Sequence, residues 1–579
     1  MRASHSRILA LVAAGALTTI FSTPAAADKC SDLSNLMLQE VTSITATSVA
    51  ANTFTPPPAF PGLPPGPPVS VAFCRAQITV QPQINIEIWL PQPEKWNHRF
   101  QAVGGGGYAG AISYSALAQA VTGDQVKGQF ATASTDTGHP TAGTANGQGA
   151  ANDARSGGGF ALNPANDTLN QGLIVDFASR SLHEMTVKAK AVILAYYGES
   201  AKFSYWNGCS TGGRQGWMEA QRFPKDYDGI LAGAPAFNWD RFIPAELWPA
   251  VAMNLGVGVP VSQTKLNVVT AAAVKGCDAL DGVVDGVISD PRKCHFDPRV
   301  LQCGKPGAPT DDTCLSDTEA RAVQQIWQGP RDPEGKFLWY GLEPGASLAG
   351  LANSAPFPIA FDHWRLWIEQ NPAFDWHSLT IASFAAGFKK SSEKFHEVIG
   401  TDDPDLSAFR RHGGKIITYH GWSDQLIFPG GSIDYFERVV AANGGAERVR
   451  KFERLFMVPG MNHCAGGASA VNFGQSSFGP PTPVAPDPEH DVILALERWV
   501  EEGVGPDKLI ATTDPQPLHA RENPTNPATF TRPLCPFPQV ARYRGTGDPN
   551  SDANFVCAVE GHHHHDHDSE DNGDNDDRD

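Results

Sequence analysis

A serine lies between two glycines in the run Gly208-Cys209-Ser210-Thr211-Gly212. A serine hydroxyl is a poor nucleophile unless a neighbouring base takes its proton, a third group orients that base, and hydrogen-bond donors stabilise the resulting oxyanion. Flanking glycines allow a strained turn that lifts such a hydroxyl clear of a sheet. The same five-residue pattern also occurs in ordinary Gly/Ser turns, so its meaning depends on the flanking elements.

The elements that flank Ser210 favour a nucleophile. Residues 204–207 are strand-like, and residues 213–222 have the pattern of a helix. A strand, a tight turn and a helix in that order form the context that a nucleophile elbow requires. We therefore interpret Ser210 as a candidate catalytic nucleophile.

Candidate partners for Ser210 follow two later strand-like runs. In an α/β-hydrolase the acid and then the histidine come after the serine, at the ends of strands where the sheet presents its site. Asp424 follows the strand-like run 415–420, and His463 follows the run 454–458. Taken alone, Asp424 could also be a turn or helix-cap aspartate, and His463 an ordinary loop histidine.

Two cysteines support this assignment. Cys209 directly precedes Ser210, and Cys464 directly follows His463. A disulfide between them would tether the nucleophile loop to the base loop and hold the geometry that the reaction needs. The alternative is two unrelated buried cysteines.

Strands alternate with helices on both sides of a long insertion. Helix-like stretches at about 180–197, 431–443 and 488–502 accompany the strands, whereas 237–403 shows no such alternation. We predict an α/β-hydrolase fold with a large inserted lid domain. The catalytic domain would comprise 28–236 and 404–560, and the lid 237–403.

The two ends of the chain have compositions unlike the rest. Residues 1–27 combine Arg2 and Arg7 with an apolar stretch and a small-residue cleavage site, which indicates a signal peptide rather than a membrane anchor. No other segment has the apolar length to cross a bilayer. Residues 561–579 form a His- and Asp-rich tail that we predict to be disordered; weak metal binding by this tail is the alternative.

Export predicts an oxidising compartment, either extracellular or periplasmic, and the cysteine content agrees. The ten cysteines are an even number, which suggests full pairing, although spacing alone does not prove the connectivity. Local spacing suggests three bridges and leaves two more distant ones: Cys277–Cys294, Cys303–Cys314 and Cys535–Cys557, then Cys30–Cys74 and Cys209–Cys464. The net charge of −18 argues against nucleic acid and anionic membranes as partners.

The constellation Cys209-Ser210, Asp424 and His463-Cys464 resembles that of the tannase and feruloyl esterase family, which includes MHETase-type enzymes. The resemblance covers essentially the whole mature chain. It implies that Ser210 is the nucleophile, His463 the general base and acid, and Asp424 the orienting carboxylate. It also implies an oxyanion hole made by the backbone N–H of Thr211 and one N–H from the glycine run 104–107, with Gly105 or Gly106 as candidates.

A second cluster of acidic residues lies in the predicted lid, in the run 277–287. Its three carboxylates and two glycines could surround one hard cation such as calcium, or could form an Asx-rich turn without metal. The family carries a calcium ion in a similar lid loop. The resemblance then implies a structural Ca²⁺ held by the following residues: Asp278, Asp281 and Asp285, with the carbonyls of Val283 and Val287. No organic cofactor is implied.

The resemblance favours esters of aromatic acids as substrates, either small or attached to a feruloylated polysaccharide. Feruloyl and other hydroxycinnamoyl esters are the first expectation, and galloyl esters or a terephthalate monoester are the alternatives. Trp364, Trp367 and Trp376 could line an aryl pocket or form lid core, while Ile427 and Phe428 supply an apolar wall near Asp424.

Two further function classes compete with this prediction. A carbohydrate-binding or adhesion protein on an esterase fold would have no need of the complete set Ser210, Asp424 and His463. A hydrolase of another bond type, such as a peptidase or a lactonase, is compatible with the sequence. Oligomeric state is not encoded in any pattern that we found.

Overall fold

The computed structural model describes residues 29–58, 65–123, 126–139, 157–163, 165–475, 483–513 and 530–559. The predicted signal peptide at 1–27 and the predicted tail at 561–579 lie outside these residues. Within the described ranges, no helix is long and apolar enough to cross a membrane.

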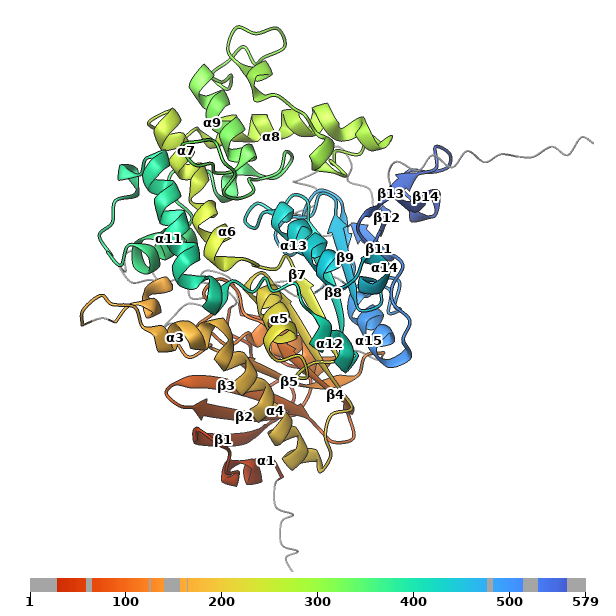
Figure 1. Ribbon diagram of the computed structural model, residues 1–579. Coiled ribbons are helices and arrows are strands. Elements are labelled where there is room, and N and C mark those ends of the chain that lie inside the picture. The colour runs from red at the N-terminus through yellow and green to blue at the C-terminus, as the bar shows by residue number, and fades with distance from the viewer. Residues whose placement is uncertain are drawn as a thin grey trace, which may run out of the picture.

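A nine-stranded sheet occupies the centre of the described structure, with the strand order β1-β2-β3-β5-β4-β6-β7-β8-β9 (Figure 1). Following this spatial order, the pairs β1-β2, β2-β3 and β3-β5 are antiparallel, and all the remaining pairs are parallel. The strands are β1 (Val41–Val49), β2 (Phe73–Val80), β3 (Ile84–Pro91), β4 (Trp96–Val103), β5 (Gln129–Thr135), β6 (Phe203–Cys209), β7 (Gly229–Gly233), β8 (Lys415–Gly421) and β9 (Glu453–Val458).

Helices cover both faces of the parallel half. Alternate residues of one strand enter different cores: Trp206 packs in the core under α4, α5 and α13, and Tyr205 in the core under α2 and α15. This two-sided burial explains why almost every residue of β6, β7, β8 and β9 is buried rather than every second one. The helices of this half are α1 (Lys29–Asp32), α2 (Tyr114–Thr122), α3 (Gln171–Val175), α4 (Ser181–Tyr197), α5 (Thr211–Arg222), α12 (Ser407–His412), α13 (Pro429–Ala442), α14 (Ala446–Val449) and α15 (Val492–Glu502).

The predicted helix at 180–197 ends where the sequence indicates. Gly198 adopts a left-handed conformation (φ 82°), and its N–H donates to the carbonyl of Leu194 at 2.9 Å. Glycine adopts this conformation without the steric cost that a side chain would add.

The chain leaves the sheet after β7 and returns to it at β8, and most of the intervening residues, up to the end of α11, form a group of helices beyond the sheet (Figure 1). These helices are α6 (Trp239–Glu246), α7 (Trp248–Gly256), α8 (Gln263–Cys277), α9 (Asp317–Gln328), α10 (Pro358–Asp362) and α11 (Ile381–Ile399). They share an apolar core of their own that contains Trp364 and Trp367, and Tyr108 and Phe177 from the sheet half enter it. The parallel sheet with a helical insertion confirms the predicted α/β-hydrolase architecture.

Short strands complete the C-terminal part. β10 (Ala470–Asn472), β11 (Leu509–Thr513) and β12 (Thr531–Leu534) form a small antiparallel sheet, and β13 (Gln539–Tyr543) pairs with β14 (Phe555–Val559).

Candidate active site

Ser210 occupies a strained turn between β6 and α5. Its backbone has φ 64° and ψ −125°, a conformation that residues with a side chain rarely adopt. A Cβ atom on Gly208 would lie 2.7 Å from the carbonyl group of Gly212, and one on Gly212 would lie 3.1 Å from Cα of Gly104. The two glycines are therefore needed for close backbone approach, which distinguishes this turn from an ordinary Gly/Ser loop.

Asp424 and His463 come from the loops after β8 and β9, and their side chains meet. Nδ1 of His463 lies 2.8 Å from Oδ2 of Asp424, and the other carboxylate oxygen accepts the N–H groups of Leu426 and Ile427 at 2.9 Å each. The Asp424 side chain is fully buried. These contacts fix both the carboxylate and the ring that it orients.

The Asp424 carboxylate is held in its charged form despite its burial. Burial alone would raise its pKa, but the charge of His463 and the hydrogen bonds from His420 and His463 lower the pKa well below its ordinary value. A charged carboxylate can keep the proton of His463 on Nδ1 and leave Nε2 available to accept one.

Ser210 and His463 line the same cavity, so the structure gathers the three residues that the sequence singles out. The cavity is otherwise mainly apolar. Its other lining residues are Gly106, Gly107, Thr211, Ala236, Trp239, Phe242, Ile243, Glu246, Phe357, Ile359, Leu426 and Ile427.

The glycine run after β4 borders this cavity and is anchored from two sides. The N–H of Gly105 donates to Oε1 of Gln215 at 3.0 Å, and the carbonyl of Tyr108 lies 2.6 Å from Nε2 of His139. Burial lowers the pKa of His139 to about 4, and the other ring nitrogen, Nδ1, lies 3.0 Å from the carbonyl of Thr137.

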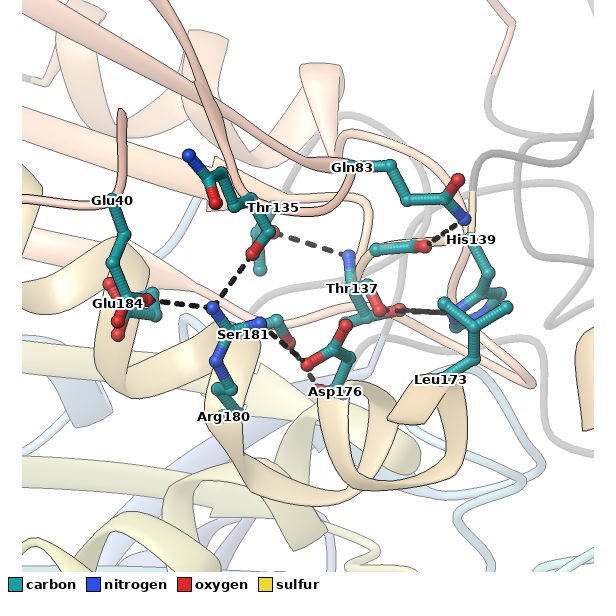
Figure 2. Close-up of polar contacts among 12 residues, drawn as sticks. Glu40, Gln83, Thr135, Thr137, His139, Leu173, Asp176, Arg180, Ser181 and Glu184 are labelled. Carbon is teal, nitrogen blue, oxygen red and sulfur yellow. Dashed lines mark hydrogen bonds and ion pairs between the residues drawn. The ribbon is translucent and has the colours of Figure 1, made fainter. Parts of the chain in front are cut away.

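His139 is itself held by residues near the end of β5. Figure 2 shows its ring beside Thr137, and Thr137 Oγ1 lies 3.3 Å from Nδ1 of His139. The ring also stacks on Phe160, with 3.8 Å between the ring centroids. The same close-up shows Gln83, whose side-chain amide donates to the carbonyl of Gly138 at 2.8 Å, and the Asp176–Arg180 ion pair alongside (Figure 2).

One face of α6 forms a wall of the cavity that the sequence analysis missed. Trp239, Phe242, Ile243 and Glu246 follow the spacing i, i+3, i+4, i+7 of a single helical face. That spacing was available in the sequence as a signal, but the frequent Trp and Pro of the region obscured it.

The tryptophans that the sequence offered as pocket candidates lie elsewhere. Trp364 and Trp367 are fully buried in the apolar core of the inserted helices, and Trp376 packs against that core. From the segment 356–376, Phe357 and Ile359 line the cavity instead. Ile427 and Phe428, the apolar pair after Asp424, both belong to the apolar core of the inserted helices, and Ile427 also lines the cavity.

The acidic loop after α8 folds around one of its own carboxylates. Asp278 accepts the N–H groups of Asp285 and Gly286 at 3.0 Å, and Asp285 forms an ion pair with Arg532 at 2.8 Å. Asp281 accepts from the hydroxyl of Ser289 and from the N–H of Val283. Among the described residues, no three acidic, histidine or cysteine side chains converge enough to hold a metal by themselves.

A model of the tannase and feruloyl esterase family matches residues 69–558. The chain belongs to this family. It is 38% identical over 520 residues to a protein named "Probable feruloyl esterase" from Arthroderma benhamiae, covering 87% of this chain and 89% of that protein. It is also 34% identical over 538 residues to the mono(2-hydroxyethyl) terephthalate hydrolase of Piscinibacter sakaiensis, covering 82% and 81% of the two chains.

The fold agrees with that family membership. The crystal structure of feruloyl esterase B from Aspergillus oryzae superposes with a TM-score of 0.76 at 29% identity, covering 92% of this chain and 99% of that one. The predicted family is therefore confirmed, and this tannase/feruloyl esterase family member is a carboxylic ester hydrolase.

All five predicted disulfides are present in this family member. They are Cys30–Cys74, Cys209–Cys464, Cys277–Cys294, Cys303–Cys314 and Cys535–Cys557. Cys209–Cys464 joins the residues next to Ser210 and His463 across a sequence separation of 255, with 5.9 Å between the Cα atoms. The loop that carries Ser210 and the loop that carries His463 are thus covalently connected.

Proposed function

We propose that this protein hydrolyses esters of hydroxycinnamic acids, feruloyl esters first, through an acyl-enzyme on Ser210. The observation that carries the proposal is the meeting of the strained Ser210 turn with the His463–Asp424 pair at one mainly apolar cavity. His463 takes the Ser210 proton while Oγ attacks the ester carbonyl. The protonated His463 then gives that proton to the departing alcohol, and water repeats the sequence to release the acid.

The oxyanion that forms in each step would be held by the backbone N–H groups of Thr211 and Gly106. The N–H of Gly105 already donates to Gln215, which favours Gly106 over Gly105 for this role. Gly106 and Thr211 both border the cavity, and Thr211 Oγ1 donates to the Gly107 carbonyl, which links the two loops. Backbone donors fixed in this way need no reorganisation when the charge develops.

The cavity lining favours an uncharged aromatic acyl group. Trp239, Phe242 and Phe357 supply ring surfaces, and no arginine or lysine is found among the described residues that line the cavity. A terephthalate monoester carries a carboxylate that would enter this apolar site without a cationic partner, at considerable cost. This argues for feruloyl over terephthalate esters.

A panel of model esters tests the proposal. Methyl ferulate, methyl gallate, a terephthalate monoester and a peptide anilide are compared by kcat/KM. We expect methyl ferulate to be the best substrate, with the terephthalate monoester at least about tenfold poorer because its charge is desolvated unpaired. Preferred cleavage of the anilide, or of the terephthalate monoester, would contradict the proposal.

We further propose that the acidic loop 278–287 binds a structural calcium ion through Asp278, Asp281, Asp285 and the carbonyls of Val283 and Val287. Support comes from an oxygen-only donor set, which suits a hard cation, and from the Cys277–Cys294 bridge that braces the loop. The two flanking cysteines and Ile288 form a small core beneath it. The ion would stabilise the lid and take no part in the chemistry.

Removing this ion is expected to lower the melting temperature by a few degrees, because a ligand that binds only the folded state stabilises it. EDTA treatment followed by thermal denaturation measures the shift, and added Ca²⁺ should reverse it where Mg²⁺ does not. An unchanged melting temperature together with no metal by elemental analysis would remove the calcium proposal.

The protein is also proposed to be exported to the periplasm or the exterior. Five disulfides fit an oxidising compartment, where such bonds persist. N-terminal sequencing of the mature protein from the medium or periplasm, with a start at or near Asp28, would support cleavage after residue 27.

A further inference from the structure

Glu246 is a buried carboxyl group in the wall of the catalytic cavity. It is the last residue of α6, is 2% exposed, and lines the cavity with Ser210 and His463. It occupies the fourth position of a helical face whose other three members, Trp239, Phe242 and Ile243, are apolar. A leucine at this place would satisfy the packing, so the carboxyl group calls for another explanation.

No polar group of the described chain compensates this burial. Oε2 of Glu246 is buried and lacks a hydrogen-bond partner among the described residues. A buried polar atom without a partner costs roughly 1–3 kcal/mol, and natural proteins seldom keep one without a use. The missing partner is expected to come from a molecule that enters the cavity.

The surroundings of Glu246 favour its neutral form. Burial raises its pKa well above the ordinary value, and the negative charge of Asp424 raises it further. The C-terminal end of α6 adds the partial negative charge of the helix dipole. A neutral carboxyl group can both donate and accept a hydrogen bond, as a phenolic hydroxyl can, so the two groups can pair in either direction.

We propose that Glu246 is a specificity-determining residue that hydrogen-bonds the phenolic hydroxyl of the substrate's aromatic acyl ring. The proposal rests on the aromatic ester hydrolysis proposed above and names the feature that the site would select: a ring hydroxyl para to the ester-bearing chain. Ferulate, coumarate and caffeate share that hydroxyl. The apolar members of the α6 face would contact the ring, and Glu246 would pair with the one polar group at its far end.

Two esters of nearly equal shape isolate this hydrogen bond. Methyl 4-hydroxycinnamate carries the hydroxyl, and methyl 4-methylcinnamate replaces it with a methyl group of similar volume. We expect the wild-type protein to prefer the 4-hydroxy compound by about tenfold or more in kcat/KM, because the 4-methyl compound leaves the buried carboxyl group of Glu246 unpaired. An effect on the triad that changes kcat/KM for both esters by the same factor leaves the ratio of the two kcat/KM values unchanged.

Variants of Glu246 then assign the preference to this residue. Glu246→Leu should reduce the ratio about tenfold, towards one, since no polar group remains to be satisfied. Glu246→Gln, which can still donate and accept, should retain most of the preference. Glu343→Gln is the matched control. Burial also raises the pKa of Glu343, to about 7, but Glu343 does not line the cavity. The ratio of the two kcat/KM values in the Glu343→Gln protein should therefore equal that of wild type.

Each outcome decides the proposal. A wild-type ratio near one overturns the proposal without any variant. The wild-type measurement therefore tests the proposal even if Glu246→Leu fails to fold. A ratio unchanged in Glu246→Leu, even with lower overall activity, assigns Glu246 to packing or to an effect on Asp424 and also overturns it. If neither ester is hydrolysed, the proposed function itself is overturned. If both esters are hydrolysed equally well, only the inference about Glu246 is overturned.

Discussion

Ser210→Ala is expected to reduce kcat on methyl ferulate by roughly 10⁴-fold or more, as loss of a serine nucleophile does in hydrolases of this type. In the proposed mechanism the hydroxyl oxygen of Ser210 bonds to the acyl group, and no second serine and no cysteine lines the cavity among the described residues. Steady-state hydrolysis of methyl ferulate by the wild-type protein and the Ser210→Ala variant, prepared in parallel, measures the change in kcat.

The fold should survive this substitution. The strained conformation at residue 210 is imposed by the contacts around it, including the hydrogen bond from its N–H to the carbonyl of Gly233 at 2.9 Å. Alanine retains that bond, so the melting temperature should stay within a few degrees of wild type. Retained activity on an aryl ester in a folded Ser210→Ala protein would show that Ser210 is not the nucleophile.

The paired substitution Cys209→Ala/Cys464→Ala should affect both stability and turnover. The bridge spans 255 residues, so its loss releases a large loop in the unfolded chain and is expected to cost about 5 kcal/mol of unfolding free energy. Activity well below the melting temperature should fall by about 100-fold, because a displacement of 1 Å between nucleophile and base has that order of effect. Denaturant unfolding and kcat measure the two consequences.

A second disulfide supplies the matched control. Cys303–Cys314 closes a sequence separation of 11 in the inserted region, and neither residue lines the cavity. Cys303→Ala/Cys314→Ala should therefore cost less stability than the long-range pair, and kcat should stay within about twofold of wild type. Equal losses of kcat in the two double variants would mean that the 209–464 bridge has no special role in positioning Ser210 and His463.

The sequence predicted the parts of the site that depend on local pattern. The Ser210 turn, the strand-end positions of Asp424 and His463, and the pairing of their cysteine neighbours follow from residue type and order. β7 was missed because Gly229–Gly233 is short, begins and ends with glycine, and shows no alternation. Its place in the sheet is fixed by its neighbours β6 and β8 rather than by its own residues.

Other features of the site depend on contacts between distant residues. The choice between Gly105 and Gly106 rests on a hydrogen bond to Gln215, more than a hundred positions away in the chain. The burial of Glu246 depends on how the inserted helices pack over the sheet half, which no local pattern encodes. Trp364, Trp367 and Trp376 could be assigned to core rather than pocket only from the folded structure.

In the proposed mechanism Ser210 carries the acyl group during turnover. Rapid acid quench of a reaction with methyl ferulate, followed by reduction, digestion and peptide mass spectrometry, tests it directly. We expect a feruloyl adduct on the peptide that contains Ser210, formed within the first turnover and absent from Ser210→Ala. A feruloyl adduct on another residue, or turnover by wild-type protein with no adduct at any quench time while Ser210→Ala stays active, would contradict it.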